Sequence, residues 1–513
     1  MSIITGAILY QLLGVVIGFA TLAILYSKWA FQFWKNKGVP YFEPKFIWGN
    51  LSPPHKRTVP LGDELAELYQ KGKDKGWKHV GLYNMVSPIY LPIDLNILKH
   101  VLTKDFNHFV DRGFYVNEKD EPIGAHLFAI GGKKWKNLRS KLTPTFTSGK
   151  MKAMFQTIAD CGAQLNKYLV DELAHNEPIE IKDVLGNFST DIIGSCAFGL
   201  ECNSFKDPNN PFRTYGRQIF RRSPLQNLKF MIANNFPDFG RLIGITILDK
   251  EAVDFFSQVV RDTVANREKN QVHRNDFMQL LINIKNNKEE DVEHIDDGTS
   301  LTIDQIIAQS FVFFTAGFET SSTTIAFALY ELSKNQNIQQ KLRDEINQVL
   351  KKHNGRITYD SVSEMKYMNQ IIDETLRIHS PAPFVTRVCV EDYVVPGYDV
   401  TIKKGVRVFI PIKGIHLDEE YYPNPKVFNP ERFSDENKHD RDQYAHIPFG
   451  EGPRLCIGMR FGLMETKVAL TNILKDFKIT LSKKTVQPLK LQPLSVIPQV
   501  VGGIWLDMKK LKN

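Results

Sequence analysis

The sequence predicts an α+β protein that is mostly α-helical, with a smaller β region and an N-terminal transmembrane anchor helix. Three features lead to this prediction: an uncharged apolar run at residues 3–26, helical periodicity along most of the chain, and two stretches of alternating apolar residues. The 513 residues are 42% hydrophobic and 24% charged, as in a globular protein with a sizeable core. Length alone would allow about three domains, but no flexible linker or internal repeat divides the chain.

The apolar run at residues 3–26 is long enough to cross a bilayer as a helix. Basic residues follow it and none precedes it, so the positive-inside rule places the rest of the chain in the cytoplasm. A cleaved signal peptide would have a basic start and a shorter run, and a buried core helix is the other alternative. We expect the aromatic residues after the run to lie at the membrane interface: Trp29, Phe31, Phe33 and Trp34.

The predicted organisation has three parts: an anchor at residues 1–27, a basic and aromatic interface with a Pro-rich hinge at residues 28–54, and the main folded body at residues 55–513. Gly14 and Gly18 form a G-x-x-x-G motif that can pair membrane helices. One such motif in a glycine-containing span is weak evidence, and we favour an anchor that does not self-associate.

Periodicity predicts the elements of the body in order. Alternating apolar residues predict a strand pair at 79–84 and 88–93, and a second β-rich stretch at 384–411 with a Pro396-Gly397 turn. Helical spacing predicts helices at residues 135–142, 151–172, 253–267, 303–334, 338–352, 363–378 and 458–477. The acidic stretch 289–297 is expected to be a solvated loop before the long helix, which Thr302 and Gln305 open with a capping box.

Charge and cysteine content exclude several function classes. The net charge is +8, from 65 basic and 57 acidic residues, and no basic cluster accompanies a nucleic-acid-binding motif. A membrane surface or an acidic protein partner fits this modest excess better. The five cysteines form no C-x-x-C pair or zinc-binding spacing, which argues for a reducing compartment.

The most informative segment fits the pattern F-x-x-G-x-R-x-C-x-G with Phe449, Gly452, Arg454, Cys456 and Gly458. A cysteine just before an apolar helix presents a thiolate to helical N–H groups, which lower its pKa, and thiolates are among the few ligands of haem iron. The glycines allow a tight loop beside a flat cofactor, Arg454 can pair with a haem propionate, and Phe449 can shield the sulfur. A buried free cysteine is the alternative, and five matched positions argue against it.

This segment is similar to the haem-ligand signature of the cytochrome P-450 haem-thiolate monooxygenases, which the chain resembles along nearly its whole length. Segments 146–149, 430–433 and 449–460 resemble most closely the microsomal clan of vertebrate family 3 and insect family 6. The resemblance implies an α+β haem-thiolate catalytic domain at residues 55–513 that binds haem b through the thiolate of Cys456.

The resemblance also implies the activity and its partners. The expected enzyme inserts one atom of O₂ into a lipophilic small molecule: a xenobiotic, plant toxin, insecticide, or endogenous lipid or hormone. Its electrons come from NADPH through a reductase flavoprotein, with cytochrome b5 as a further candidate partner. The expected location is the endoplasmic reticulum membrane, with the catalytic domain on the cytoplasmic side and in contact with lipid.

The long predicted helix carries a polar interruption at residues 316–321. Gly, Glu and hydroxyl residues are poor choices for a buried helix interior, and such departures often mark function. We expect Ala316 and Gly317 to lie against the haem, Thr320 to open the helix to water or O₂, and Glu319 to deliver protons, because reducing O₂ consumes protons. The structural alternative is a packed helix whose hydroxyls bond their own carbonyls.

Other candidate residues fall into three groups. Glu374 and Arg377 can pair on one helical face, and the resemblance implies that Arg432 completes a structural triad. It also implies that Trp135, Arg139, Arg112, Arg387 and Arg454 contact the propionates. The lysines around Trp135, at positions 133, 134, 136 and 141, either face an acidic flavoprotein or are simply solvated. The family pattern places these residues in the substrate pocket: Phe114, Leu127, Phe128, Val312, Ala382, Pro383, Val385, Val496 and its neighbours Ser495 and Ile497.

Two rival functions remain open at this point. A haem-thiolate isomerase or dehydratase rearranges a peroxide without O₂ or electrons, but family members of that kind typically lose the acid–alcohol pair that Glu319 and Thr320 provide. A non-catalytic haem carrier or sensor would not need a polar interruption in the long helix.

Overall fold

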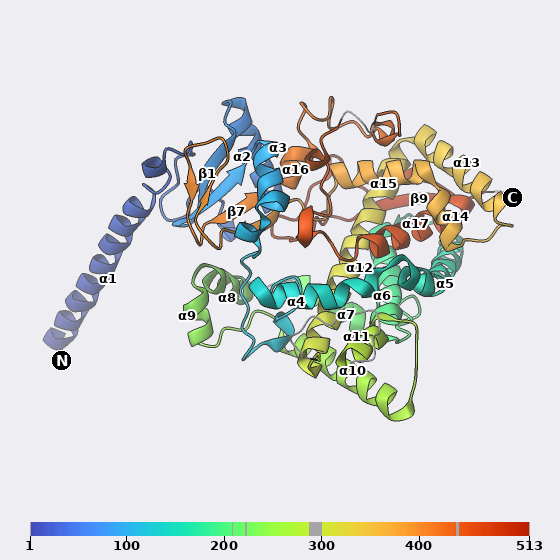
Figure 1. Ribbon diagram of the computed structural model, residues 1–513, viewed down its shortest axis with the longest axis horizontal. Helices are drawn as coiled ribbons and strands as arrows, with labels where there is room; N and C mark the ends of the chain where they lie inside the picture. The colour runs from blue at the N-terminus through green and yellow to red at the C-terminus, as the bar shows by residue number, and fades with distance from the viewer. Residues whose placement is uncertain (1, 208, 221–222, 287–299, 438–440, 512–513) are drawn as a thin grey trace.

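A computed structural model describes residues 2–207, 209–220, 223–286, 300–437 and 441–511. Figure 1 shows a helix-rich body with sheets and an N-terminal helix, α1 (Ser2–Ala30), that projects away from it. The predicted acidic loop at 289–297 lies outside the described residues.

The N-terminal side of the body is built around a mixed sheet in the strand order β1-β2-β7-β4. β1 pairs with β2 and β4 with β7 in antiparallel fashion, while β2 and β7 are parallel. A second sheet has the order β3-β9-β8, and β5 pairs with β6. The strands are β1 (His79–Asn84), β2 (Ser87–Pro92), β3 (Ile179–Glu180), β4 (Val385–Val388), β5 (Tyr393–Val394), β6 (Thr401–Ile402), β7 (Arg407–Ile410), β8 (Phe477–Leu481) and β9 (Trp505–Lys510).

Helices form most of the remaining body, and α12 packs against α6, α10, α15 and α17. They are α2 (Leu61–Asp74), α3 (Leu95–Lys99), α4 (Gly132–Leu142), α5 (Ser148–Glu172), α6 (Ile181–Ile193), α7 (Pro211–Phe220), α8 (Pro224–Asn235), α9 (Pro237–Leu242), α10 (Lys250–Asn270), α11 (Phe277–Lys285), α12 (Ile303–Lys334), α13 (Gln336–Lys352), α14 (Tyr359–Glu364), α15 (Lys366–Ile378), α16 (Ile412–His416) and α17 (Met459–Asp476).

The long helix α12 begins and ends where the sequence predicts. Its capping box is present, with the Thr302 hydroxyl accepting from Gln305 N and the Gln305 side chain accepting from Thr302 N. The single helix predicted at 363–378 is wrong, because the chain breaks at Met365 into α14 and α15. The carboxylate of Glu345 accepts hydrogen bonds from the backbone N–H groups of Tyr367 and Met368, at 2.7 and 2.9 Å. These N–H groups have no partner within the first turn of the helix, so the bonds stabilise the new helix start.

The apolar helix α1 makes little contact with the body. Of the most apolar 18 residues in its candidate membrane span, Gln11–Lys37, only 6% are buried, and side chains such as Phe19 and Leu22 are exposed. The helix is therefore long and apolar enough to span a membrane. Gly14 and Gly18 meet no neighbouring atoms within 4 Å.

The chain after α1 corrects one sequence prediction. Trp29 is exposed, as expected at an interface, but Trp34 is fully buried in the core of the first sheet. Its indole N–H donates to Leu82 O at 2.9 Å, and its ring lies where a Cβ on Gly81 would be. Trp34 therefore belongs to the folded body and not to the membrane interface.

These contacts predict different results for two N-terminal deletions. Removing residues 1–26 should weaken membrane association and leave the melting temperature unchanged, because α1 buries little of its surface against the body. Removing residues 1–34 should also lower the stability by about 3–5 kcal/mol, because it takes away the buried Trp34 ring. Membrane flotation and thermal unfolding measure the two effects. A destabilised shorter deletion would show that the apolar segment belongs to the fold.

Candidate haem site

The loop before α17 has a backbone that demands glycine at one position. Gly452 has φ +74°, and a Cβ there would lie 1.9 Å from Leu102 O, so no other residue fits. The loop is closed by a hydrogen bond from Cys456 N to Phe449 O at 3.0 Å. Cys456 is thereby held just before the first turn of α17.

Cys456 differs from the other four cysteines, all of which are buried, because its surface is exposed. Burial nevertheless raises its pKa, while the backbone N–H of Gly458 and the charges of Arg112 and Arg139 act in the opposite direction. The exposed surface therefore faces a space inside the protein. The backbone N–H of Gly458 lowers the pKa of the thiol, in the predicted direction, but in the protein alone burial outweighs it and the net pKa is raised.

Three arginines from separate parts of the chain converge near this loop. Arg387 on β4 and Arg454 are almost fully buried, and Arg112 is half-buried. Burial lowers the pKa of Arg112 to about 10 and that of Arg454 to about 9, and holds that of Arg387 well below its ordinary value. The charges of Arg112 and Arg454 lower the pKa of Arg387 further. Among the described residues, no ion pair joins these three to a carboxylate.

Backbone carbonyls satisfy only part of this cluster. Arg454 donates to Val110 O, Leu127 O and Ile130 O at 2.8–3.3 Å, and Arg112 donates to Arg454 O at 3.2 Å. The Nε atoms of Arg112 and Arg387 are buried without a partner. Unpaired buried cations are costly, so the arrangement fits the two propionates of a haem.

Three further residues were predicted to contact the cofactor: Arg139, Trp135 and Gly317. Arg139 on α4 is close enough to Cys456 for the two to affect each other's pKa, and Trp135 lies under the Arg454 guanidinium at 4.1 Å. Gly317 packs closely against α6, because a Cβ on it would lie 2.5 Å from the Ile193 side chain. Its contact with the cofactor stays a prediction.

The side chains of Thr320 and Glu319 lie on different faces of α12 and have different partners. Ala316 is exposed although its helix is otherwise largely buried, and Thr320 Oγ1 donates to Ala316 O at 2.7 Å. Thr320 thus bonds its own helix, as the structural alternative supposed. Glu319 is about 100° further round the helix, where its Oε1 lies 3.1 Å from Lys182 Nζ of α6.

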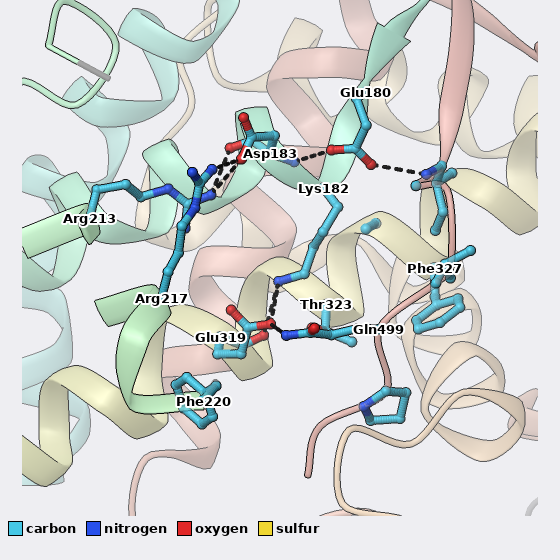
Figure 2. A pocket seen from close by; sticks show the side chains of 15 residues that line it. Glu180, Lys182, Asp183, Arg213, Arg217, Phe220, Glu319, Thr323, Phe327 and Gln499 are labelled. Atoms are coloured by element: carbon cyan, nitrogen blue, oxygen red, sulfur yellow. Dashed lines mark hydrogen bonds and ion pairs between the residues drawn. The ribbon is translucent and has the colours of Figure 1, made fainter. Parts of the chain in front are cut away.

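Glu319 lines a pocket of about 390 Å³ that sequence reasoning did not identify. Figure 2 shows Lys182 and Glu319 pointing toward one another across this pocket, with Gln499 beside them. Lys182 also donates to Ser322 Oγ at 2.6 Å, and burial lowers its pKa. The Oγ1 of Thr323, which also lines the pocket, is buried without a hydrogen-bond partner, so the pocket has room and polar groups for water.

The predicted structural triad is brought together in the interior. Arg377 donates to both carboxylate oxygens of Glu374, at 2.6 and 2.8 Å, and both side chains are fully buried. Arg432 Nε lies 3.5 Å from Glu374 Oε1. Arg377 also donates to His416 O, and Glu374 accepts from Asn429 N. The network therefore ties α15 to α16 and to the chain that leads to the Cys456 loop.

The predicted pocket residues are only partly assembled. Phe114 and Phe128 are exposed, their ring centroids lie 5.1 Å apart, and the Arg112 guanidinium lies 4.1 Å over Phe128. The ring of Pro383 is buried beside Gly62 of α2, and its place in the substrate pocket stays a prediction. Leu127 is buried in the main core. The structure leaves Ala382, Val312 and Val385 partly exposed, and Val496 exposed, with Ser495 partly exposed and Ile497 buried beside it.

An exposed apolar surface on α8, α9 and the residues flanking α9 also escaped sequence reasoning. We call it the α8–α9 apolar surface, and it comprises Leu225, Leu228, Phe236, Phe239, Leu242 and Ile243. The spacing of the last four residues is helical and could have revealed it. Such a cluster is unusual on a soluble surface and marks an interaction site.

Comparison with known proteins gives consistent matches. A sequence profile described as "Cytochrome P450" matches residues 40–502. Cytochrome P450 6a2 of Drosophila melanogaster is 41% identical over 96% of this chain and 97% of its own length. Cytochrome P450 6A1 of Musca domestica is 38% identical and Cytochrome P450 6k1 of Blattella germanica 41% identical, each over 99% of both chains.

Breaking the buried triad should destabilise the protein strongly. Arg377→Leu leaves the carboxylate of Glu374 buried without its main partner, and the unfolding free energy should fall by about 3–5 kcal/mol. Arg356→Leu, at an exposed arginine, serves as the matched control. Urea unfolding followed by circular dichroism measures both. Equal stability of the two variants would contradict a structural role for the triad.

Proposed function

The chain belongs to the cytochrome P450 family as a family 6 haem-thiolate monooxygenase, and on this premise we propose how its residues hold the haem and which substrates it oxidises. The haem supplies O₂ activation when bound, and thiolate ligation favours O–O cleavage. In the proposal, Cys456 supplies the thiolate, and Arg112, Arg139, Arg387 and Arg454 pair with the propionates. The observation that carries this assignment is the convergence of guanidinium groups that have no carboxylate partner among the described residues, two of them with an unsatisfied buried Nε, near the exposed surface of Cys456.

The proposed substrate is a lipophilic small molecule, such as a xenobiotic, plant toxin, insecticide, lipid or hormone. The exposed aromatic pair of Phe114 and Phe128, which lies beside Arg112, supports this, because aromatic side chains that line a binding site favour apolar ligands. In the proposal, the exposed Ala316 and the partly exposed Val312 extend this apolar wall from α12. A screen of lipophilic compounds for a blue shift of the Soret band would identify ligands of the wild-type protein.

Two side chains of α12 are proposed to deliver protons. Glu319 would take protons from water in the pocket of Figure 2, because that pocket brings a carboxylate, an ammonium group and an unpaired hydroxyl together. Thr320 would guide a proton on the neighbouring helix face, where its hydroxyl can exchange the Ala316 carbonyl for water.

A microsomal P450 receives its electrons from a reductase flavoprotein. We place the docking face on α4, where Lys133 and Lys136 are exposed, while Lys134 is engaged with Glu118 at 2.8 Å. The proposed location is the endoplasmic reticulum membrane, anchored by α1. The α8–α9 apolar surface supports a second contact with lipid, and cytochrome b5 is a further candidate partner.

The thiolate assignment predicts a spectroscopic loss. Cys456→Ala should remove the reduced carbon-monoxide absorption band at about 450 nm that thiolate-ligated haem gives. Cys389→Ala, which removes a buried cysteine elsewhere, should keep the band. Persistence of the band in Cys456→Ala would contradict the assignment.

The proton-delivery role predicts uncoupling. Thr320→Ala and Glu319→Gln should still bind substrate and oxidise NADPH, but more of the reduced oxygen should leave as peroxide or water, because proton transfer in this step contributes roughly 100-fold or more. The quantity to measure is product formed per NADPH oxidised, with peroxide assayed in parallel.

A matched control is available one turn along the helix. Thr324 Oγ1 donates to Thr320 O at 2.9 Å, the same type of bond that Thr320 makes to Ala316. Thr324→Ala should therefore leave the ratio unchanged. If the ratio also stayed unchanged in both Thr320→Ala and Glu319→Gln, the proton-delivery proposal would fail.

A further inference from the structure

Glu465 on α17 is a buried acid to which the proposed function gives no role. The residue is fully buried, on a helix that packs against both α5 and α12. Ser189 of α6 donates a short hydrogen bond to its Oε1, whereas Oε2 is buried without a partner. The hydroxyl of Ser321 on α12 faces the same carboxyl and favours its ionised form, although it makes no hydrogen bond of ordinary geometry to Oε2.

This carboxyl lies directly behind the turn of α12 that carries Thr320. Ser321 follows Thr320 in the chain, and a Cβ on Gly462, one turn before Glu465, would lie 3.6 Å from Ser321 Oγ. The backbones of α12 and α17 are therefore close at this level. Glu465 is the acidic side chain of α17 that reaches both α6 and α12 here.

We propose that Glu465 is a positioning residue whose carboxyl, held between Ser189 and Ser321, fixes the turn of α12 that carries Thr320. A proton on Oε2 would let this atom donate to Ser321 Oγ while Oε1 accepts from Ser189, so that both oxygens are satisfied and no charge is buried. Loss of that proton places a negative charge in the interior and makes Ser321 the donor. This inference rests on the proposed function, because it concerns how Thr320 is held.

The protonation state supports this picture. Burial raises the pKa of Glu465 to about 8, and the hydrogen bonds of Ser189 and Ser321 and the charge of Lys182 act in the opposite direction. The other titratable groups that face it are Cys161 of α5, whose pKa burial raises to about 12, and Cys196, whose pKa burial raises well above its ordinary value. Both thiols stay neutral in the range where Glu465 titrates, so Lys182 is the charged neighbour to consider.

A stability measurement tests the burial of the acid without using activity. The pKa of Glu465 is higher in the folded protein than its ordinary value of 4.5, so the folded state keeps a proton that the unfolded state has lost. Its contribution to stability is present at low pH and is lost as the pH rises toward about 8. Glu465→Gln does not titrate, so its melting temperature relative to wild type should rise from about pH 5 to about pH 8 and then level off.

A coupling measurement tests the positioning role. Product formed per NADPH in the wild type should fall about twofold as the pH rises from about 7 to about 9, whereas Glu465→Gln should keep the neutral-pH ratio throughout. Ser189→Ala removes a hydrogen bond that favours the ionised form of Glu465, so the fall in product per NADPH should move to higher pH. Asp191→Asn is the matched control: Asp191 is another buried acid whose pKa is raised by burial, but it binds Ser204, and its coupling curve should match wild type.

The outcomes separate this inference from the proposed function. A wild-type protein that forms no product from the lipophilic compounds that shift its Soret band would overturn the proposed substrate class, while the stability curves would still report on the carboxyl. Parallel coupling curves for wild type and Glu465→Gln would overturn the positioning role. If Glu465→Gln failed to fold, an unshifted curve for Ser189→Ala would overturn it instead.

Discussion

The positions of Arg112, Arg387 and Arg454 are the constraint on which the rest of the site depends. The three guanidinium groups come from a loop, a strand and the Cys456 loop, and burial lowers the pKa of each. Like charges in a poorly hydrated interior are stable together only when an anion lies between them. Because the carbonyls of Val110, Leu127 and Ile130 hold Arg454 on one side, its orientation also fixes the loop that carries Cys456. In the proposed haem site, Arg454 would therefore both pair with a propionate and hold the loop of the iron ligand in place.

The sequence was most informative where a local rule determines the structure. The bounds of α12 follow from a capping box and a long apolar period, and Gly452 stands where the tight loop takes a positive φ of +74°. The errors arose where a distant segment decides the outcome. Trp34 was expected at the membrane interface, but Gly81 leaves the space that its ring fills in the core. The close packing of Gly317 against Ile193 of α6 was likewise not predicted. Neither partner lies within thirty residues of the residue it affects, so no local pattern could have revealed them.

The structure also separates two properties of α12 that the sequence had joined in a single motif. Glu319 and Thr320 are neighbours in the chain, yet one side chain meets Lys182 in a polar pocket and the other bonds its own helix. A period of 3.6 residues makes this separation inevitable, because consecutive side chains point about 100° apart. Two adjacent residues on a helix therefore lie in two different environments. Here Glu319 lines a pocket with room for water, and Thr320 lies on the face that carries Ala316.

The proposed lipid contact of the α8–α9 apolar surface would determine which substrate concentration the enzyme responds to: the concentration in the membrane, not the concentration in water. A lipophilic compound dissolves mostly in the bilayer, and a protein held there by α1 and by a second apolar contact would draw its substrate from that phase. The relevant quantity is then the amount of substrate per volume of lipid. Adding membrane at a fixed total amount of substrate dilutes it, so an apparent KM in aqueous units grows with the lipid in the assay. Two preparations that differ only in lipid content would rank the same substrates differently, according to their partition coefficients.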